Sequence, residues 1–305
     1  MPHASDDPTP LDRKPAVPVR MGFASLTSRI GHPEANRASH TERCIRAADA
    51  GVRLLAFPEL SLTGYGLSPS ALLSAEPLPG PGSDHLLNLA VKHGMVLCGG
   101  IMERSRSGKR YLTHLVCHPS GHLRWYRKLH LSPGEQTIFT PGHHIPLFHL
   151  YGMTMGIQLC YDAHFPELST LMRQEGADVL LIPHASPRGT PEQKRDSWMR
   201  HLPARAYDNS LYVMAGNPVG SNGEHLLFPG VALGLTPDGR LASACLSADA
   251  AMLLTLDVDR DALHRLRAHP MRHFFSSRVL LSVDPSPRKI IHYHFRQSDP
   301  VSTRP

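Results

Sequence analysis

The sequence predicts an α/β fold, because strand-like and helix-like segments alternate along most of its length. Short apolar runs such as 52–57 and 178–183 are typical of buried strands. The longer stretch 34–50 is typical of a helix packed against a sheet. With 305 residues, 41% of them hydrophobic, the chain can bury a large core in one α/β unit. Taken alone, the alternation suggests an ordinary doubly wound sheet.

The candidate elements follow one another in chain order. We expect strands at 17–24, 52–57, 95–101, 111–118, 122–128, 153–159, 178–183, 211–217, 230–236, 240–246 and 251–257. We expect helices at 34–50, 83–93, 165–175 and 191–208, with a short one at 259–266. The turn at 119–122 joins two of the strands and predicts a β-hairpin.

Cys160 lies where a predicted strand meets a predicted helix. The stretch 153–159 leads directly into it, and a helical pattern follows Pro166. Such an elbow holds a thiol outside the sheet near a helix N-terminus, where backbone N–H groups favour a thiolate and stabilise developing negative charge. A buried, inert cysteine at the end of a core strand is the alternative.

Two other strand ends carry polar residues. Glu59 leaves an apolar strand after Pro58, whose fixed φ gives it a defined direction. Because Phe57 and Leu60 flank this carboxylate, we expect partial desolvation and a pKa raised toward that of a general base. Lys128 ends the second strand of the hairpin. Taken singly, the two are also compatible with a solvated loop acid and an ordinary surface lysine.

Together, these segments resemble the nitrilase superfamily, the carbon–nitrogen hydrolases. The matching stretches are 57–59, 126–131, 159–162 and 165–167, in the family's order and at intervals that suit its fold. The resemblance extends from about Pro18 to about Arg267. It also includes the stretches 36–50, 205–209 and 230–239.

The resemblance implies a four-layer α-β-β-α sandwich, with two sheets face to face and helices outside. It divides the chain into a Pro-rich flexible arm (1–16), a carbon–nitrogen hydrolase domain (17–267) and an extended C-terminal tail (268–305). Because such tails often embrace a partner subunit in this family, we expect a homodimer or higher homo-oligomer. Trp198 and Met199 are adjacent and cannot both face the sheet, which favours an apolar residue at an interface.

The resemblance also implies a Glu-Lys-Cys catalytic triad. Cys160 is the expected nucleophile, and Glu59 the base that takes its proton and later activates water. Lys128 is expected to face the oxyanion, together with the backbone N–H of Tyr161. Glu135 matches a second glutamate of amidase-type members, which holds Lys128 and helps to place the substrate. The product carbon leaves as a carboxylic acid from a thioester intermediate, after ammonia or an amine has departed.

The substrate class is less sharply defined. Tyr161-Asp162 after the cysteine is more similar to the branches that cleave amide and carbamoyl groups than to true nitrilases. His184 and Arg188 lie on a loop that lines the pocket in relatives, and either is a candidate partner for a substrate carboxylate. His164, four residues past Cys160, also borders the expected pocket. A true nitrilase and a non-catalytic scaffold of the same fold remain the alternatives.

Composition and charge exclude several function classes. The net charge of +6 comes without an aromatic-interleaved basic module, so we expect no nucleic-acid partner. The 21 histidines show no metal-site spacing, and we expect neither a metal nor a cofactor. Five scattered cysteines favour a reducing compartment, with Cys44, Cys98 and Cys117 as core thiols. Without a signal-peptide pattern or an 18-residue apolar run, we expect a cytoplasmic protein that does not enter a membrane.

Overall fold

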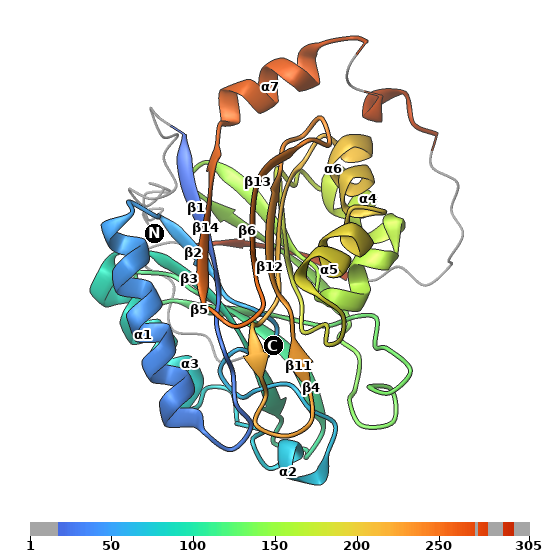
Figure 1. Ribbon diagram of the computed structural model, residues 1–305. Helices are drawn as coiled ribbons and strands as arrows, with labels where there is room; N and C mark the ends of the chain where they lie inside the picture. Colours follow the sequence, from blue (N-terminus) through green and yellow to red (C-terminus); the bar gives the residue numbers. More distant parts are fainter. Residues whose placement is uncertain (1–17, 272–273, 280–288, 296–305) are drawn as a thin grey trace, which may run out of the picture.

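Two β-sheets face each other in the protein, and helices cover the outer side of each (Figure 1). The computed structural model describes residues 18–271, 274–279 and 289–295. The predicted α-β-β-α sandwich is therefore confirmed, and the doubly wound alternative is wrong.

The first sheet carries two of the predicted site residues at one edge. Its strands are β1 (Val19–Ser25), β2 (Leu54–Ala56), β3 (Val96–Arg104), β4 (Arg110–Cys117), β5 (Leu123–Arg127) and β14 (Met252–Val258). Their order is β14-β1-β2-β3-β4-β5. β2 and β3 run parallel, and the β3–β4 and β4–β5 pairs are antiparallel. β5 thus runs in the same direction as β2, so the carboxyl ends of both strands lie at the same edge.

The second sheet carries the cysteine. Its strands are β6 (His144–Leu150), β7 (Met153–Ile157), β8 (Val179–Pro183), β9 (Tyr212–Gly216), β12 (Gly230–Leu235), β13 (Leu241–Ser247) and β15 (Lys289–His294), in the order β13-β12-β9-β8-β7-β6-β15. β7, β8 and β9 are mutually parallel. The loops that follow β7 and β8 therefore meet at one edge. A two-stranded hairpin, β10 (Gly220–Ser221) and β11 (Leu227–Phe228), completes the strands of the described residues.

The helices form the two outer layers. α1 (Pro33–Asp49) and α3 (Pro81–His93) lie on the first sheet, and α4 (Pro166–Gln174), α5 (Pro191–Trp198) and α6 (Leu202–Asn209) lie on the second (Figure 1). Each of α1, α3, α4 and α5 begins with a proline, whose fixed φ suits the first helical turn. The remaining helical segments are α2 (Pro69–Leu72), α7 (Arg260–Ala268) and the 3₁₀ turns η1 (Cys160–His164) and η2 (Phe275–Ser277).

The largest apolar core lies between the sheets and includes Phe23, Ile157 and Leu181, all without exposed surface. A second core fills the space between the first sheet and helices α1 and α3. Cys44, Cys98 and Cys117 are buried in these cores, as predicted, and burial raises the pKa of each thiol. These three cysteines are thus packing residues.

The predicted helix 191–208 is wrong as a single helix. α5 ends at Trp198 and α6 begins at Leu202, because Pro203 lacks an N–H for the preceding turn and its ring opposes continuation. Trp198 is 4% exposed and stacks on His184, with ring centroids 3.9 Å apart. Trp198 therefore belongs to the core, and Met199 is partly buried against the same core. The expected homo-oligomer stays a prediction.

Four strands were absent from the sequence prediction: the short strands β10 and β11, and the longer strands β6 and β15. Pro146 interrupts the apolar run of β6, but it precedes the first β6–β7 pair at Leu147, where its missing N–H is tolerated. Residues Lys289–His294, expected in an extended tail without a sheet partner, pair in parallel with β6 as β15. This part of the tail thus belongs to the second sheet. The arm at 1–16 and the tail residues 272–273, 280–288 and 296–305 lie outside the described residues.

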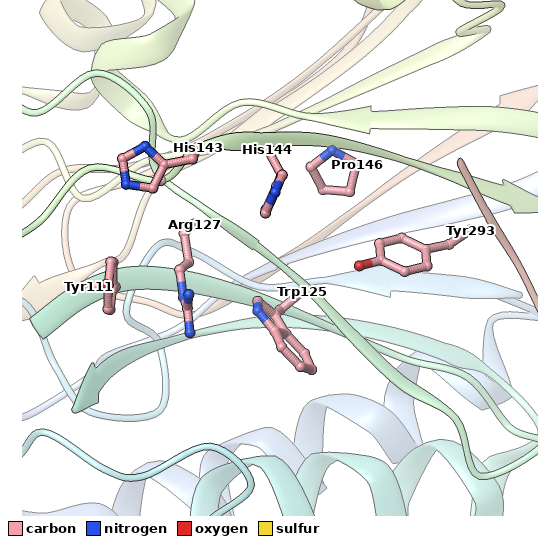
Figure 2. Close-up of a pocket in the computed structure, with 8 residues that line it drawn as sticks. Tyr111, Trp125, Arg127, His143, His144, Pro146 and Tyr293 are labelled. Carbon is pink, nitrogen blue, oxygen red and sulfur yellow. The ribbon is translucent and has the colours of Figure 1, made fainter. Parts of the chain in front are cut away.

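A small pocket opens where the edges of the two sheets approach each other. Figure 2 shows its lining from β4, β5, β6 and β15, with Arg127 between Tyr111 and Trp125. The Arg127 guanidinium carbon lies 4.2 Å from the centroid of the Tyr111 ring. Two of its guanidinium nitrogens donate to Glu103, at 2.8 Å from Nε to Oε2 and 2.5 Å from Nη2 to Oε1. Arg127 therefore braces this edge of the first sheet, and the lining of the pocket contains none of the predicted triad.

Candidate active site

Three strand ends bring the predicted triad to one edge between the sheets. Glu59 follows β2, Lys128 follows β5, and Cys160 begins η1 after β7. The backbone N–H of Glu59 donates to the carbonyl of His184, 3.2 Å away, which follows β8 of the opposite sheet. This hydrogen bond joins the two sheets beside the site.

Lys128 lies between two carboxylates. Its ammonium donates to Glu59 Oε1 at 2.9 Å and to Glu135 Oε1 at 3.0 Å. All three side chains are 1–2% exposed. Tyr65 OH and the backbone N–H of Ser132 also donate to Glu135, at 3.0 Å and 2.8 Å. Glu135 is thereby fixed against Lys128, as the resemblance implied.

The second oxygen of Glu59 is free. Glu59 Oε2 is buried and has no hydrogen-bond partner among the described residues. Burial raises the pKa of this carboxyl to about 7, although Lys128 opposes the shift and Glu135 adds to it. The expectation of a raised pKa is confirmed. Near neutral pH, Glu59 therefore has both the free oxygen and the proton affinity that a general base requires.

Cys160 sits in a strained elbow. It is half-buried, and its φ of 45° lies in the left-handed region, which is rare for residues other than glycine. Burial and the Glu59 charge raise the pKa of the thiol to about 12, despite opposing effects of Lys128 and the Ala185 N–H. The favourable backbone and lysine are therefore outweighed by desolvation, and the resting thiol is neutral. The thiol needs a base when it reacts.

Asp162 holds the elbow in place. Its Oδ2 accepts from Tyr126 OH at 2.7 Å and from the backbone N–H of Leu159 at 2.9 Å. Its Oδ1 accepts from the backbone N–H of His130 at 2.8 Å and lies 2.9 Å from His130 Nδ1. This carboxylate links the loop after β5 to the loop after β7, and so sets the positions of Lys128 and Cys160 relative to each other.

The four predicted substrate-binding residues fall in different environments. Tyr161 is half-buried and lines a pocket with His130 and Phe165, whereas His164 is exposed. His184 is 3% exposed, and burial holds its pKa well below the usual range, so it is neutral. Arg188 is exposed and has a φ of 74°. The structure thus brings Tyr161 and His184 beside the triad and leaves His164 and Arg188 toward solvent.

Some residues around the site were not identified from the sequence. Asp162 stands in the matched stretch, but nothing in the pattern showed that its carboxylate would link the loops after β5 and β7. Tyr65 and Lys194 are remote in sequence and reach the site only through the fold. Lys194, on α5, donates to Ser186 Oγ in the loop after β8 at 2.7 Å. For these two residues, sequence spacing gave no signal.

The described residues lack two other kinds of feature. No group of three or more His, Cys, Asp or Glu side chains in that part of the chain is arranged to hold a metal ion. No helix in the same ranges is long and apolar enough to cross a membrane. The cytoplasmic location remains a prediction.

Comparison with known proteins places the chain in a family. An (R)-stereoselective amidase of a Pseudomonas species is 28% identical over 79% of this chain and 86% of its own length. An omega-amidase of Xenopus tropicalis is 29% identical over 79% of this chain and 88% of its own length.

A solved structure has the same fold. A CN-hydrolase superfamily protein of Xanthomonas campestris matches with a TM-score of 0.77, at 22% identity, over 88% of this chain and 99% of that one. The sequence profile of the carbon-nitrogen hydrolase family matches residues 23–268, most of the chain. The chain therefore belongs to the carbon-nitrogen hydrolase family, in the nitrilase superfamily.

Proposed function

We propose that this protein hydrolyses a non-peptide C–N bond of a small amide or N-carbamoyl compound through a cysteine thioester. The observation that carries the proposal is the buried Lys128 ammonium held by Glu59 and Glu135, with one Glu59 oxygen free. This arrangement supplies a base and a fixed positive charge at the edge where Cys160 lies.

The first half-reaction forms the thioester. Glu59 Oε2 takes the Cys160 proton while the sulfur forms a bond to the substrate carbonyl carbon. The carbonyl oxygen becomes an oxyanion, which faces the Lys128 ammonium and the backbone N–H of Tyr161. Glu59 then gives its proton to the leaving nitrogen, the C–N bond breaks, and ammonia or an amine departs. Because the resting thiol is neutral, Glu59 acts during the attack and not before it.

The second half-reaction restores the enzyme. Glu59 takes a proton from a water molecule, whose oxygen attacks the thioester carbon. The C–S bond then breaks, the proton returns to the Cys160 sulfur, and the carboxylic acid leaves. One base thus serves both halves, and a carboxyl with a pKa of about 7 releases and accepts protons readily near neutral pH.

Glu135 and Asp162 favour the amidase branch over the nitrilase alternative. Glu135 keeps one oxygen on Lys128 and the other on the backbone of Ser132, so the ammonium has a fixed direction. The Tyr161-Asp162 pair after the cysteine is the feature of the amide- and carbamoyl-cleaving branches noted above. Asp162 in this chain also fixes the elbow through Leu159 and Tyr126.

A homo-oligomer remains part of the proposal. Supporting it are three exposed apolar side chains on α6 and after α7, namely Tyr207, Met271 and Phe274. The Tyr207 and Phe274 rings lie 5.9 Å apart, so two of the three form one patch. Sedimentation at micromolar concentration tests this, and a fully active 33.6 kDa monomer would contradict it.

One experiment tests the reaction class. Ammonia release is measured from amides, N-carbamoyl compounds and nitriles, and intact-mass analysis detects the acyl-enzyme in quenched samples. Turnover of amides or carbamoyl compounds with an acyl adduct on Cys160 supports the proposal. Turnover of nitriles alone would make the protein a nitrilase, and no turnover with any compound would support the scaffold alternative.

A further inference from the structure

Lys194 is a cation of the site that the proposed chemistry leaves unused. Its ammonium donates to Ser186 Oγ at 2.7 Å and to the carbonyl of Pro187 at 3.0 Å. The side chain is half-buried, and no carboxylate of the described residues lies in ion-pair range of it. An ammonium has three donors, so one remains for a further acceptor.

The fold brings this ammonium close to the nucleophile. The backbone N–H of Ala185 is directed at the Cys160 sulfur, and Ser186, which binds Lys194, is the next residue. Consecutive α-carbons are only about 3.8 Å apart. Trp198, one helical turn beyond Lys194 on the same face of α5, stacks on His184. This face of α5 therefore covers the loop that follows β8, beside Cys160.

The loop that presents Ser186 is fixed from behind. The buried Asn217 accepts from the Ser186 N–H at 2.8 Å and donates to the Ser186 carbonyl at 2.9 Å. Asn217 Nδ2 also donates to the Pro229 carbonyl at 2.8 Å. Because both backbone groups of Ser186 are held, its hydroxyl and the Lys194 ammonium keep their positions before a ligand arrives. Such preorganisation lowers the entropic cost of binding.

Lys194 is the cation that is available to bind an anion, in contrast to Lys128, His184 and Arg188. Lys128 is committed to Glu59 and Glu135. His184 is neutral, and its Nδ1 lies 2.8 Å from the Ile182 carbonyl. Arg188 is exposed, whereas Lys194 is half-buried and is held by Ser186 and Pro187 in the loop after β8. A partly desolvated ammonium with only neutral partners is stabilised when an anion joins them.

We propose that Lys194, together with Ser186 Oγ, binds a carboxylate at the far end of the substrate. The preferred substrates are then amides or N-carbamoyl compounds that carry a carboxylate on the side remote from the scissile bond. This inference rests on the proposed function, because it places the substrate carbonyl at Cys160. It also moves carboxylate recognition from His184 and Arg188, the sequence candidates, to a residue of α5.

The test compares charged and neutral amides of matched shape. The monoamides of succinic and glutaric acid are compared with 4-methylpentanamide and 5-methylhexanamide, in which an isopropyl group replaces the carboxylate. Lys194→Met should lower kcat/KM at least ~10-fold for the two acids, mainly through KM, and less than ~3-fold for the neutral amides. The matched control is Arg195→Met, which removes the neighbouring cation of α5 and should leave both substrate classes unchanged. Lys194→Gln repeats the test should the Met variant fold poorly.

The outcomes separate this inference from the proposed function. If Lys194→Met lowers kcat/KM equally for charged and neutral amides, Lys194 only positions the loop and the inference is overturned. A wild-type protein that prefers the neutral amides would also overturn it. Calorimetry of Cys160→Ala with the monoamide of glutaric acid measures binding without turnover. If no amide is hydrolysed, the proposed function fails. Binding that disappears in Cys160→Ala/Lys194→Met then still supports the carboxylate site, and binding unaffected by Lys194→Met overturns it.

Discussion

Arg127 and Lys128, adjacent at the end of β5, form ion pairs that differ in whether every carboxylate oxygen has a partner. Arg127 binds both oxygens of Glu103, and Thr113 Oγ1 adds a hydrogen bond to Glu103 Oε2 at 2.7 Å. Lys128 is shared by Glu59 and Glu135, and it leaves Glu59 Oε2 without a partner. The first pair is closed, since each carboxylate oxygen is occupied. The second cluster, formed by Lys128, Glu59 and Glu135, is open, because one oxygen of Glu59 has no partner among the described residues.

The difference shows which charged group is available for chemistry. A planar guanidinium matches a carboxylate through two parallel hydrogen bonds and leaves little capacity for a third reactant. An ammonium is a point charge, which can hold two carboxylates and still face an oxyanion. The unoccupied oxygen of Glu59 is costly to bury, which supports the role of base proposed for this carboxylate.

The largest expected effect is at Cys160. Cys160→Ala should retain less than ~1% of wild-type turnover with an unchanged melting temperature, because no other group can form the thioester. The control is Cys117→Ala, a core thiol, which should lose about 1–2 kcal/mol of stability and keep its kcat. Ammonia release and thermal unfolding measure both variants. Turnover by Cys160→Ala well above that level would remove the nucleophile assignment.

The open cluster is tested next. Lys128→Ala and Glu59→Gln should each lower kcat at least ~10²-fold, because one removes an oxyanion partner and the other the base. Steady-state kinetics on the best amide of the panel measures the loss, and circular dichroism checks the fold. A near wild-type rate in folded Lys128→Ala would remove the oxyanion assignment, and the same result in folded Glu59→Gln would remove the base assignment.

The acidity of Glu59 gives a smaller, graded effect. Its carboxylate form is the base, so kcat/KM should rise about tenfold per pH unit below pH 7 and level off above it.

The pKa of the Glu59 carboxyl is higher in the folded state than in the unfolded chain, where it is about 4.3. Its contribution to stability is therefore complete below about pH 4.3 and is lost as the pH rises through about 7. Glu59→Gln should remove that part of the pH dependence of the unfolding free energy. For the activity, a kcat/KM that falls as the pH rises through 7 would exclude Glu59 as the base.

The sequence predicted the site well where function depends on residues at strand ends. Glu59, Lys128 and Cys160 each follow a short apolar run, so their positions could be identified before the fold was known. The raised pKa of Glu59 also followed from its apolar neighbours. The protonation state of Cys160 did not, because it depends on how deeply the loops of both sheets bury the sulfur.

Contacts between residues that are far apart in the sequence could not be predicted from the sequence pattern. The role of Asp162 requires the loops after β5 and β7 to be neighbours, and Lys194 requires α5 to lie over the loop after β8. Likewise, β15 lies far along the chain from β6, and only tertiary contacts pair them. Pro203 signals the break between α5 and α6, but the helical periodicity on both sides of it suggested one continuous helix.

The smallest expected effect is on activity when the closed pair is broken. Glu103→Gln keeps the side-chain shape but removes the charge that Arg127 and Thr113 bind, so we expect a loss of roughly 1–3 kcal/mol of stability. The kcat should stay within ~3-fold of wild type, since Glu103 is absent from the site and Lys128 keeps its own partners. Chemical denaturation and steady-state kinetics measure the two quantities on the same preparation. A stable Glu103→Gln variant with a ~10²-fold lower kcat would erase the distinction between the two pairs, because the closed pair would then control the ammonium that follows it in the chain.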